Sequence, residues 1–142
     1  MIQLLFLILT STNSYAAPAD FSPGEYKGKV IYLDFWASWC EPCKESFPWL
    51  NKMKKKYPGL EVVGVNLDKE NDKAKDFLKR HPADFKVIYD PEAKYAKKYE
   101  VKGMPYSLIF DKNGNIKHKH IGYSKDRASN YEREIKELIG AK

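Results

Sequence analysis

Apolar residues along the chain follow two patterns, short continuous runs and stripes that recur every three or four positions. Runs rich in β-branched and aromatic residues predict buried strands at residues 30–36, 60–66, 87–89 and 107–110. Asn113-Gly114 then predicts a tight turn into a further strand at residues 116–121. We therefore expect a sheet whose last two strands form a hairpin.

The stripes with helical spacing alternate with these strands and predict helices at residues 41–57, 68–80, 91–99 and 126–139. In the first helix the inward stripe includes Phe47, Leu50 and Met53, and Pro58 follows its end. Pro91 suits the first turn of the third helix, where a missing N–H is tolerated. Strands that alternate with helices, followed by a hairpin and a closing helix, predict one α/β domain with a mixed sheet.

Composition supports a single folded domain. The chain has 142 residues, 43% of them hydrophobic, with seven Phe, ten Tyr and three Trp, which is enough apolar surface to form a core. Two cysteines are too few for a disulfide-dense scaffold or a four-cysteine zinc site. The net charge of the chain is +6, and its lysines are spread along the predicted helices. We therefore expect solvated helix faces and no nucleic-acid partner.

The N-terminal segment has the pattern of a secretory signal peptide. Residues 2–9 are almost all apolar, residues 11–14 are polar, and Ala16 and Ala17 are small. We expect a signal peptide at residues 1–16 and a mature domain at residues 17–142, although no Lys or Arg precedes the apolar segment. A buried N-terminal strand or an uncleaved anchor is the alternative. Export, expected to the bacterial periplasm, would place both cysteines where disulfides form.

The strongest chemical signal is a pair of cysteines, Cys40 and Cys43, between a predicted buried strand and a predicted helix. At a helix N-terminus the N–H groups are unpaired and the dipole is positive, and both stabilise the thiolate that attacks disulfides. Pro42 is compatible with this first turn. The alternatives are a structural disulfide, which stabilises little across so short a loop, and half of a zinc site. Zinc would need further ligands; His118 and His120 alternate on a predicted strand and could share one face, but we expect them on the solvent side of the hairpin.

Asp34 interrupts the otherwise apolar strand at residues 30–36. A carboxyl group buried there must be neutral or well hydrogen-bonded. We therefore expect Asp34 to have a pKa raised by burial and to accept the proton of Cys43. The alternative is a structural acid that caps nearby backbone groups or faces water.

A family resemblance rests on the segment from Phe35 to Cys43 and on Gly103-Met104-Pro105 further along the chain. These motifs resemble the thioredoxin superfamily and, more closely, the exported TlpA/ResA-like thiol–disulfide oxidoreductases. The resemblance extends over residues 21–139 and implies a thioredoxin-like fold, with a central mixed sheet flanked by helices. Residues 67–91 are similar to the strand-helix insertion at the centre of TlpA-type proteins.

The resemblance assigns a role to each residue of the motifs. Cys40 would be the attacking thiol, Cys43 the resolving thiol, and Pro105 a cis proline beside them. The residues expected to contact substrate are Trp36, Trp39, Glu41, Pro42, Met104, Pro105 and Tyr106. Of these, the two tryptophans would form an apolar wall, and the backbone of Met104 would pair with an extended substrate segment. Tyr106, where the family often has Thr, would narrow the groove.

The acidic residue of the site departs from the subgroup. Asp34 occupies the place of the buried acid of thioredoxin, six residues before Cys40. Many TlpA/ResA-like proteins instead carry a Glu three residues after the second cysteine, and that place is Ser46 here. The chain therefore combines the acid of thioredoxin with a TlpA-like frame.

The resemblance implies a protein-disulfide reductase that needs no cofactor beyond its cysteine pair and is re-reduced by a membrane-embedded thiol donor. We expect a monomer that acts on exported proteins with disulfides. Apocytochrome c, an oxidase assembly factor and exported cysteine-containing proteins in general are all open as clients. Glu41, a negative charge beside Cys40, disfavours the thiolate and so favours a reductant. The alternatives are a net oxidant or isomerase of the same fold, and a non-catalytic module that handles a metal or haem.

Overall fold

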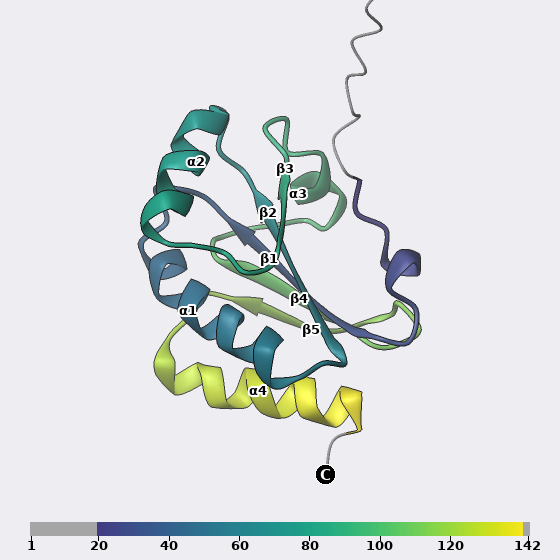
Figure 1. The fold of residues 1–142 in the computed structure, drawn as a ribbon. Coiled ribbons are helices and arrows are strands. Elements are labelled where there is room, and N and C mark those ends of the chain that lie inside the picture. The colour runs from purple at the N-terminus through teal and green to yellow at the C-terminus, as the bar shows by residue number, and fades with distance from the viewer. Residues whose placement is uncertain (1–19, 141–142) are drawn as a thin grey trace, which may run out of the picture.

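The computed structural model describes residues 20–140, which form one five-stranded sheet covered by helices on both faces (Figure 1). The strands are β1 (Val30–Trp36), β2 (Leu60–Asn66), β3 (Lys86–Tyr89), β4 (Tyr106–Phe110) and β5 (Ile116–Ile121). Their order is β3-β2-β1-β4-β5, with β1, β2 and β3 parallel and with β4 antiparallel to both β1 and β5. This is the mixed sheet that the sequence predicts. The predicted signal peptide, residues 1–16, lies outside the described residues.

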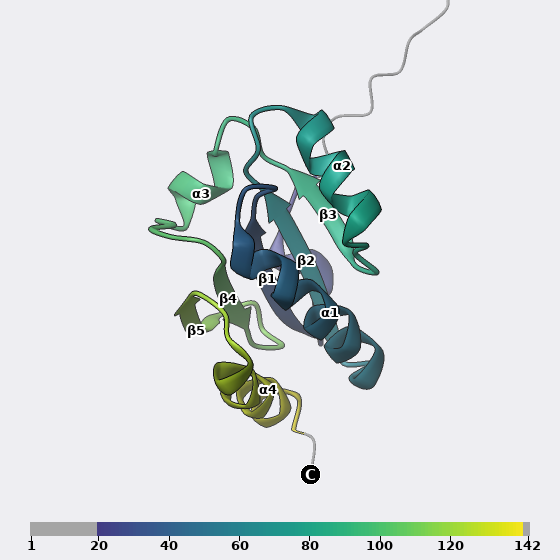
Figure 2. The same cartoon turned by 90° about the vertical axis from the view of Figure 1, so that its left-hand side faces the viewer.

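Three helices, α1 (Glu41–Lys56), α2 (Asn71–Arg80) and α4 (Lys125–Ile139), pack on one face of the sheet, as Figures 1 and 2 show. The short helix α3 (Lys94–Lys98) and the segment around the 3-10 turn η1 (Pro23–Tyr26) pack on the other face. Both α2 and β3 lie between residues 67 and 91, where the resemblance places a strand-helix insertion. Within residues 20–140 no helix is long and apolar enough to cross a membrane.

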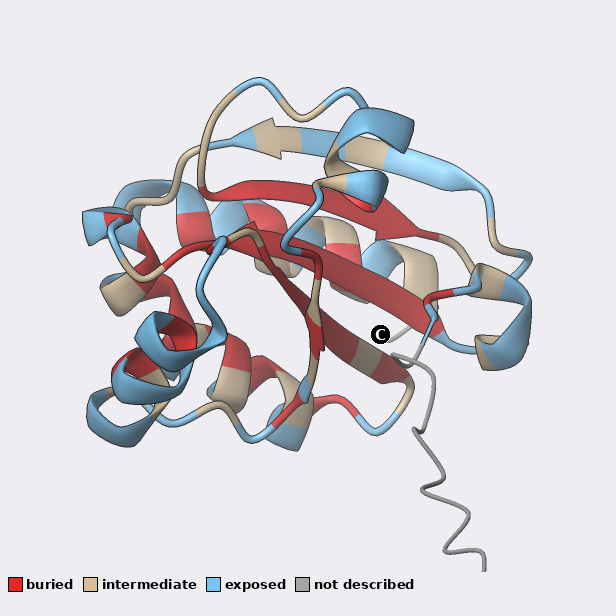
Figure 3. Ribbon diagram, turned by 90° about the horizontal axis from the view of Figure 1, so that it is seen from above, coloured by how far each residue is buried: buried red, intermediate tan, exposed pale blue. Residues whose placement is uncertain are grey.

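Strand β1 lies at the centre of the sheet, and all of its residues are buried, whereas β5 at the edge is half-buried or exposed (Figure 3). Because side chains alternate along a strand, Tyr32 and Trp36 point toward α1, whereas Phe35 points toward α3. Asp34 shares the α1 face with Tyr32 and Trp36 by the same alternation. A strand buried on both faces therefore leads directly into the loop that carries Cys40.

Two helices begin later than predicted, because an aspartate before each one accepts hydrogen bonds. Helix α2 begins at Asn71 instead of residue 68, and the carboxylate of Asp68 binds the loop after β1. Helix α3 begins at Lys94 instead of residue 91, and the carboxylate of Asp90 accepts a hydrogen bond from the N–H of Lys94. Pro91 therefore precedes this helix and is not part of its first turn.

His118 and His120 lie under α4 and not on the solvent side of the hairpin, which corrects their predicted position. Nε2 of His120 is 2.6 Å from Oε2 of Glu134, and Nδ1 of His118 is 3.5 Å from Oε1 of Glu134. The ring of His120 also stacks on Tyr131, with 4.1 Å between centroids. These contacts attach β5 to α4, and the described residues contain no group of three potential ligands arranged for a metal ion.

Candidate active site

The cysteine pair lies where the loop after β1 enters α1. Cys40 caps α1 and Cys43 lies in its first turn, and the two form a disulfide with 5.4 Å between their Cα atoms. Cys43 is fully buried, whereas Cys40 keeps 4% of its surface exposed. The predicted pairing is confirmed, and Cys40 is the less buried member of the pair.

The start of α1 determines the electrostatic environment of Cys40. The backbone of Cys40 is extended, and its own side chain makes no capping hydrogen bond to the first N–H groups of the helix. The positive end of the helix dipole stabilises negative charge at this point, which favours a thiolate. Pro42 fits the first turn because its ring nitrogen has no hydrogen to pair.

Glu41 is exposed beside Cys40, but its charge has a partner. Its Oε2 is 2.7 Å from Nζ of Lys44, one turn further along α1. The lysine offsets part of the negative potential that Glu41 adds at the sulfur. Glu41 therefore opposes thiolate formation less than its position in the sequence suggests.

Asp34 lies in the buried centre of the sheet, on the face that carries α1. It is 2% exposed, and its Oδ2 has no hydrogen-bond partner within the described part of the chain. Its pairing partner in the neighbouring strand β4 is Ser107, whose hydroxyl oxygen accepts a 3.0 Å hydrogen bond from the hydroxyl of Tyr32. Burial raises the pKa of Asp34 well above its ordinary value, as the sequence predicts.

The Met104–Pro105 peptide bond is cis, as the family resemblance implies. Pro105 precedes β4, whose first residue, Tyr106, pairs with Phe35 near the end of β1. The loop before β4 and the loop after β1 therefore lie side by side at the end of the sheet where β1 ends and β4 begins. The carbonyl of Pro105 accepts a 2.7 Å hydrogen bond from the N–H of Gly122, which attaches the proline loop to the end of β5.

The side chains expected to contact substrate divide into an accessible group and a buried group. The accessible side chains are Trp39, which is 70% exposed, Glu41, Pro42 and the half-buried Met104. Trp36, Pro105 and Tyr106 are buried, and for the two aromatic rings this corrects their predicted contact with substrate. Trp36 packs against Phe47 under α1, and Tyr106 packs against Phe35 on the opposite face of the sheet. The alternation of side chains along β1 and β4 directs both rings into the core.

Asp68 is a residue of this site that sequence reasoning missed. It lies just after β2, is 3% exposed, and accepts hydrogen bonds from Ser38 in the loop that leads to Cys40. The available signal was a pair of polar residues, Asn66 and Asp68, at the carboxyl end of a strand parallel to β1. Functional residues gather at the carboxyl ends of parallel strands, so this position alone makes Asp68 a candidate functional residue.

The chain belongs to the Redoxin family, whose sequence profile matches residues 9–135. It is similar to thiol-disulfide oxidoreductase ResA of Bacillus anthracis, with 31% identity over 114 residues, or 78% of this chain and 66% of that relative. The chain spans about half to two thirds of the length of the ResA relatives that it matches. The family therefore agrees with the ResA-like group that the motifs resemble.

Solved structures agree on the fold. A Chlorobium tepidum protein, assigned provisionally as thiol:disulfide interchange protein DsbE, is 44% identical with a TM-score of 0.80, covering 82% of this chain and 84% of its own. A thioredoxin-like superfamily protein, 23% identical, has a TM-score of 0.74 and covers 89% of this chain and 90% of its own. The fold is therefore thioredoxin-like, as the resemblance implies.

Proposed function

We propose that the protein is a thiol–disulfide oxidoreductase that reduces disulfides in exported proteins. The observation that carries the proposal is the disulfide between Cys40 and Cys43 at the start of α1, beside the Met104–Pro105 loop. Its ResA relatives bear the name thiol-disulfide oxidoreductase, and the Chlorobium tepidum protein is described as a thiol:disulfide interchange protein. The cysteine pair itself holds the two electrons of the reaction, so the proposed chemistry requires no cofactor.

In the first step, the thiolate of reduced Cys40 attacks one sulfur of a substrate disulfide. A bond forms between Cys40 and that sulfur, and the other substrate sulfur leaves as a thiolate that takes up a proton. In the second step, Cys43 loses its proton and attacks the sulfur of Cys40. The bound substrate sulfur leaves as the second thiolate, so the substrate gains two electrons and the protein ends as the Cys40–Cys43 disulfide.

Asp34 is the proposed acceptor of the proton that Cys43 loses. It lies on the face of β1 that packs against α1, where Cys43 is buried. Proton transfer works best between groups of similar pKa, and an ordinary carboxyl is a much weaker base than a thiolate. The raised pKa of Asp34 narrows that gap, which makes Asp34 a stronger base than an exposed aspartate.

Substrate binding is proposed for the accessible residues around Cys40. Trp39 offers an exposed apolar surface beside the disulfide, and Glu41 and Pro42 extend it along the start of α1. The backbone of Met104 would pair with an extended segment of the substrate, in the manner of an added strand. In an oxidising compartment, a membrane-embedded thiol donor would return the pair to its reduced form.

A trapping experiment tests this function. In reduced Cys43→Ser protein, Cys40 should still attack a disulfide-bonded model protein such as insulin, and the mixed disulfide should persist because no second thiol releases it. Mass spectrometry of the complex locates the linkage. The double variant Cys40→Ser, Cys43→Ser is the matched control and should trap nothing. Absence of any adduct with Cys43→Ser, in a variant that remains folded, would overturn the proposed exchange activity.

The direction of net electron flow has its own test. The partial compensation of Glu41 by Lys44 weakens the sequence argument for a reductant, so an oxidant of the same fold is the second candidate. Equilibration with glutathione buffers gives the reduction potential of the cysteine pair. We expect a value below about −220 mV, and a value above about −160 mV would assign the protein as an oxidant.

A further inference from the structure

The buried carboxylate of Asp68 accepts hydrogen bonds from Ser38, in the loop that carries Cys40, and from the nearby Asn66. Its Oδ2 accepts hydrogen bonds from the backbone N–H of Ser38 and from Nδ2 of Asn66, both at 2.8 Å. Its Oδ1 accepts a 2.6 Å hydrogen bond from the hydroxyl of Ser38. Asp68 makes no ion pair with any residue in the range 20–140, so these three donors are what compensates its burial.

The partner of this carboxylate is close to the reacting sulfur. Ser38 lies two residues before Cys40 and one before Trp39, whose side chain is 70% exposed. The end of β1, from which this loop starts, accepts a 2.9 Å hydrogen bond at the carbonyl of Trp36 from the N–H of Leu67. The segment after β2 thus binds the last residue of β1 through Leu67 and the cysteine loop through Asp68. Both Asp68 and Trp39 also line a hollow of about 310 Å³ beside α2.

Asp68 and Ser38 together form a clamp on the cysteine loop, and Asn66 attaches this clamp to the sheet. The side chain of Asn66 is fully buried, and its Oδ1 accepts a 3.1 Å hydrogen bond from the N–H of Asp68. Asn66 is also the last residue of β2, where it pairs with Trp36 of β1 and with Tyr89 of β3. A continuous set of contacts therefore runs from three strands of the sheet, through Asn66 and Asp68, to Ser38.

We propose that Asp68 is a positioning residue of the redox site, which holds Ser38 and thereby sets the placement of Trp39 and Cys40. The inference rests on the proposed oxidoreductase function. Hydrogen bonds to a carboxylate are shorter and stronger than neutral ones, so Asp68 restricts this loop more than a neutral side chain would. Sulfur exchange requires an aligned approach of the attacking atom, and a small displacement from alignment slows it strongly.

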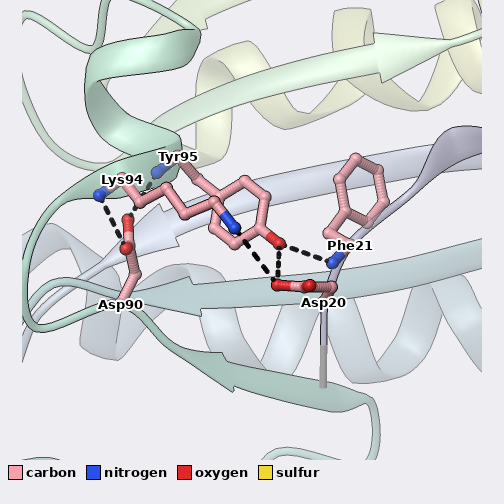
Figure 4. A network of polar contacts seen from close by, with 5 residues as sticks. All are labelled: Asp20, Phe21, Asp90, Lys94 and Tyr95. Atoms are coloured by element: carbon pink, nitrogen blue, oxygen red, sulfur yellow. Dashed lines mark hydrogen bonds and ion pairs between the residues drawn. The ribbon is translucent and has the colours of Figure 1, made fainter. Parts of the chain in front are cut away.

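A second buried aspartate provides a matched control. Asp90 is 4% exposed and lies just after β3, as Asp68 lies just after β2. Its carboxylate accepts hydrogen bonds from the N–H groups of Lys94 at 2.8 Å and Tyr95 at 2.9 Å, as Figure 4 shows. Asp90 therefore holds α3 in the way that Asp68 holds the cysteine loop. Loss of either carboxylate should weaken the fold, but only loss of the Asp68 carboxylate should slow thiol–disulfide exchange.

The experiment compares Asp68→Asn, Ser38→Ala and Asp90→Asn with the wild-type chain, at a temperature where all remain folded. We expect Asp68→Asn to lower kcat/KM for reduction of a disulfide-bonded model protein about tenfold. Ser38→Ala keeps the backbone N–H and loses only the hydroxyl, so we expect a smaller loss, of about threefold. If Asp68→Asn does not fold, Ser38→Ala decides the question alone. Equal loss of kcat/KM in the Asp68 and Asp90 variants would show a purely structural role and overturn the proposal.

Amide hydrogen exchange separates this inference from the proposed function. In Asp68→Asn the amide of Ser38 should exchange at least about tenfold faster, whereas Asp90→Asn should leave it unchanged. If the wild-type chain shows no exchange activity but the Ser38 amide behaves in this way, the proposed function fails and the clamp stands. If the wild-type chain is active and the Ser38 amide is equally protected in Asp68→Asn, the clamp fails and the function stands.

Discussion

Asp34 and Asp68 are buried to the same extent, but their surroundings differ. Asp34 lies in β1, where its Oδ2 has no hydrogen-bond partner within residues 20–140. Asp68 accepts three hydrogen bonds, two of them from the loop that carries Cys40. Hydrogen-bond donors replace the water that a carboxylate loses on burial. Asp68 has such donors, whereas Oδ2 of Asp34 has none among the described residues. Burial alone therefore does not tell what an aspartate does in this site.

The two surroundings suit different tasks. A buried carboxyl without donors keeps its proton to a higher pH than an exposed one and can exchange that proton with a thiol. A carboxylate that accepts several hydrogen bonds holds the donors in place. We infer a proton acceptor at Asp34 and a clamp at Asp68, and the same substitution to asparagine should separate them.

The largest expected effect is on the second chemical step. Asp34→Asn removes the proposed proton acceptor for Cys43, so release of the mixed disulfide should slow about a hundredfold at neutral pH. The first attack by Cys40 should remain within about twofold of wild type, because it does not need that proton transfer. Stopped-flow measurements of adduct formation and release resolve the two steps. Wild-type rates in both steps would leave Asp34 with a structural role only.

Stability should respond with opposite sign at the two aspartates. Asp68→Asn places an amide among hydrogen-bond donors, so the free energy of unfolding should fall by about 2 kcal/mol. Asp34→Asn removes a carboxyl that is costly to ionise when buried, so the free energy of unfolding should rise by about 1 kcal/mol at pH 8. Urea denaturation measures both. A loss of stability at pH 8 in Asp34→Asn as well would show that the buried carboxyl of Asp34 does not destabilise the fold as expected.

The gain at Asp34 should also depend on pH in a defined direction. The unfolded chain ionises Asp34 near its ordinary pKa of 3.8, whereas the folded chain ionises it only at a higher pH. Between these values the folded state binds more protons, so wild-type stability falls as pH rises through the window. Asp34→Asn lacks this loss. Its advantage should therefore be present at pH 8 and absent below about pH 4.

Much of the fold could be predicted because it follows from local patterns. The limits of β1 and β2 match the predicted strands, since both are buried runs rich in β-branched residues, with aromatic residues added in β1. The position of Cys40 and Cys43 at the start of α1 also follows from the local sequence. The helix that was predicted from residue 68 is displaced because Asp68 is engaged elsewhere, which local periodicity does not reveal.

The parts of the site that were missed or misassigned depend on contacts distant in sequence. Ser38 and Asp68 are 30 residues apart and meet only because β1 and β2 are parallel neighbours. Trp36 and Tyr106 belong to motifs of the site, but a motif does not give the direction of a side chain. Their strand positions direct both rings into the core, on opposite faces of the sheet.

A third carboxylate, Glu41, extends the comparison to the surface and gives the smallest expected effect. Glu41 is exposed and paired with Lys44 at 2.7 Å, so water and the lysine both screen its charge from Cys40. Glu41→Gln should raise the reduction potential by less than about 15 mV, because 30 mV corresponds to about 1.4 kcal/mol and exposed pairs contribute less than that. Equilibration of wild type and variant in the same glutathione buffers measures the difference. A rise above about 40 mV would mean that Glu41 controls the thiolate of Cys40 despite its exposure, and that exposure is as poor a guide to the influence of a carboxylate as burial is.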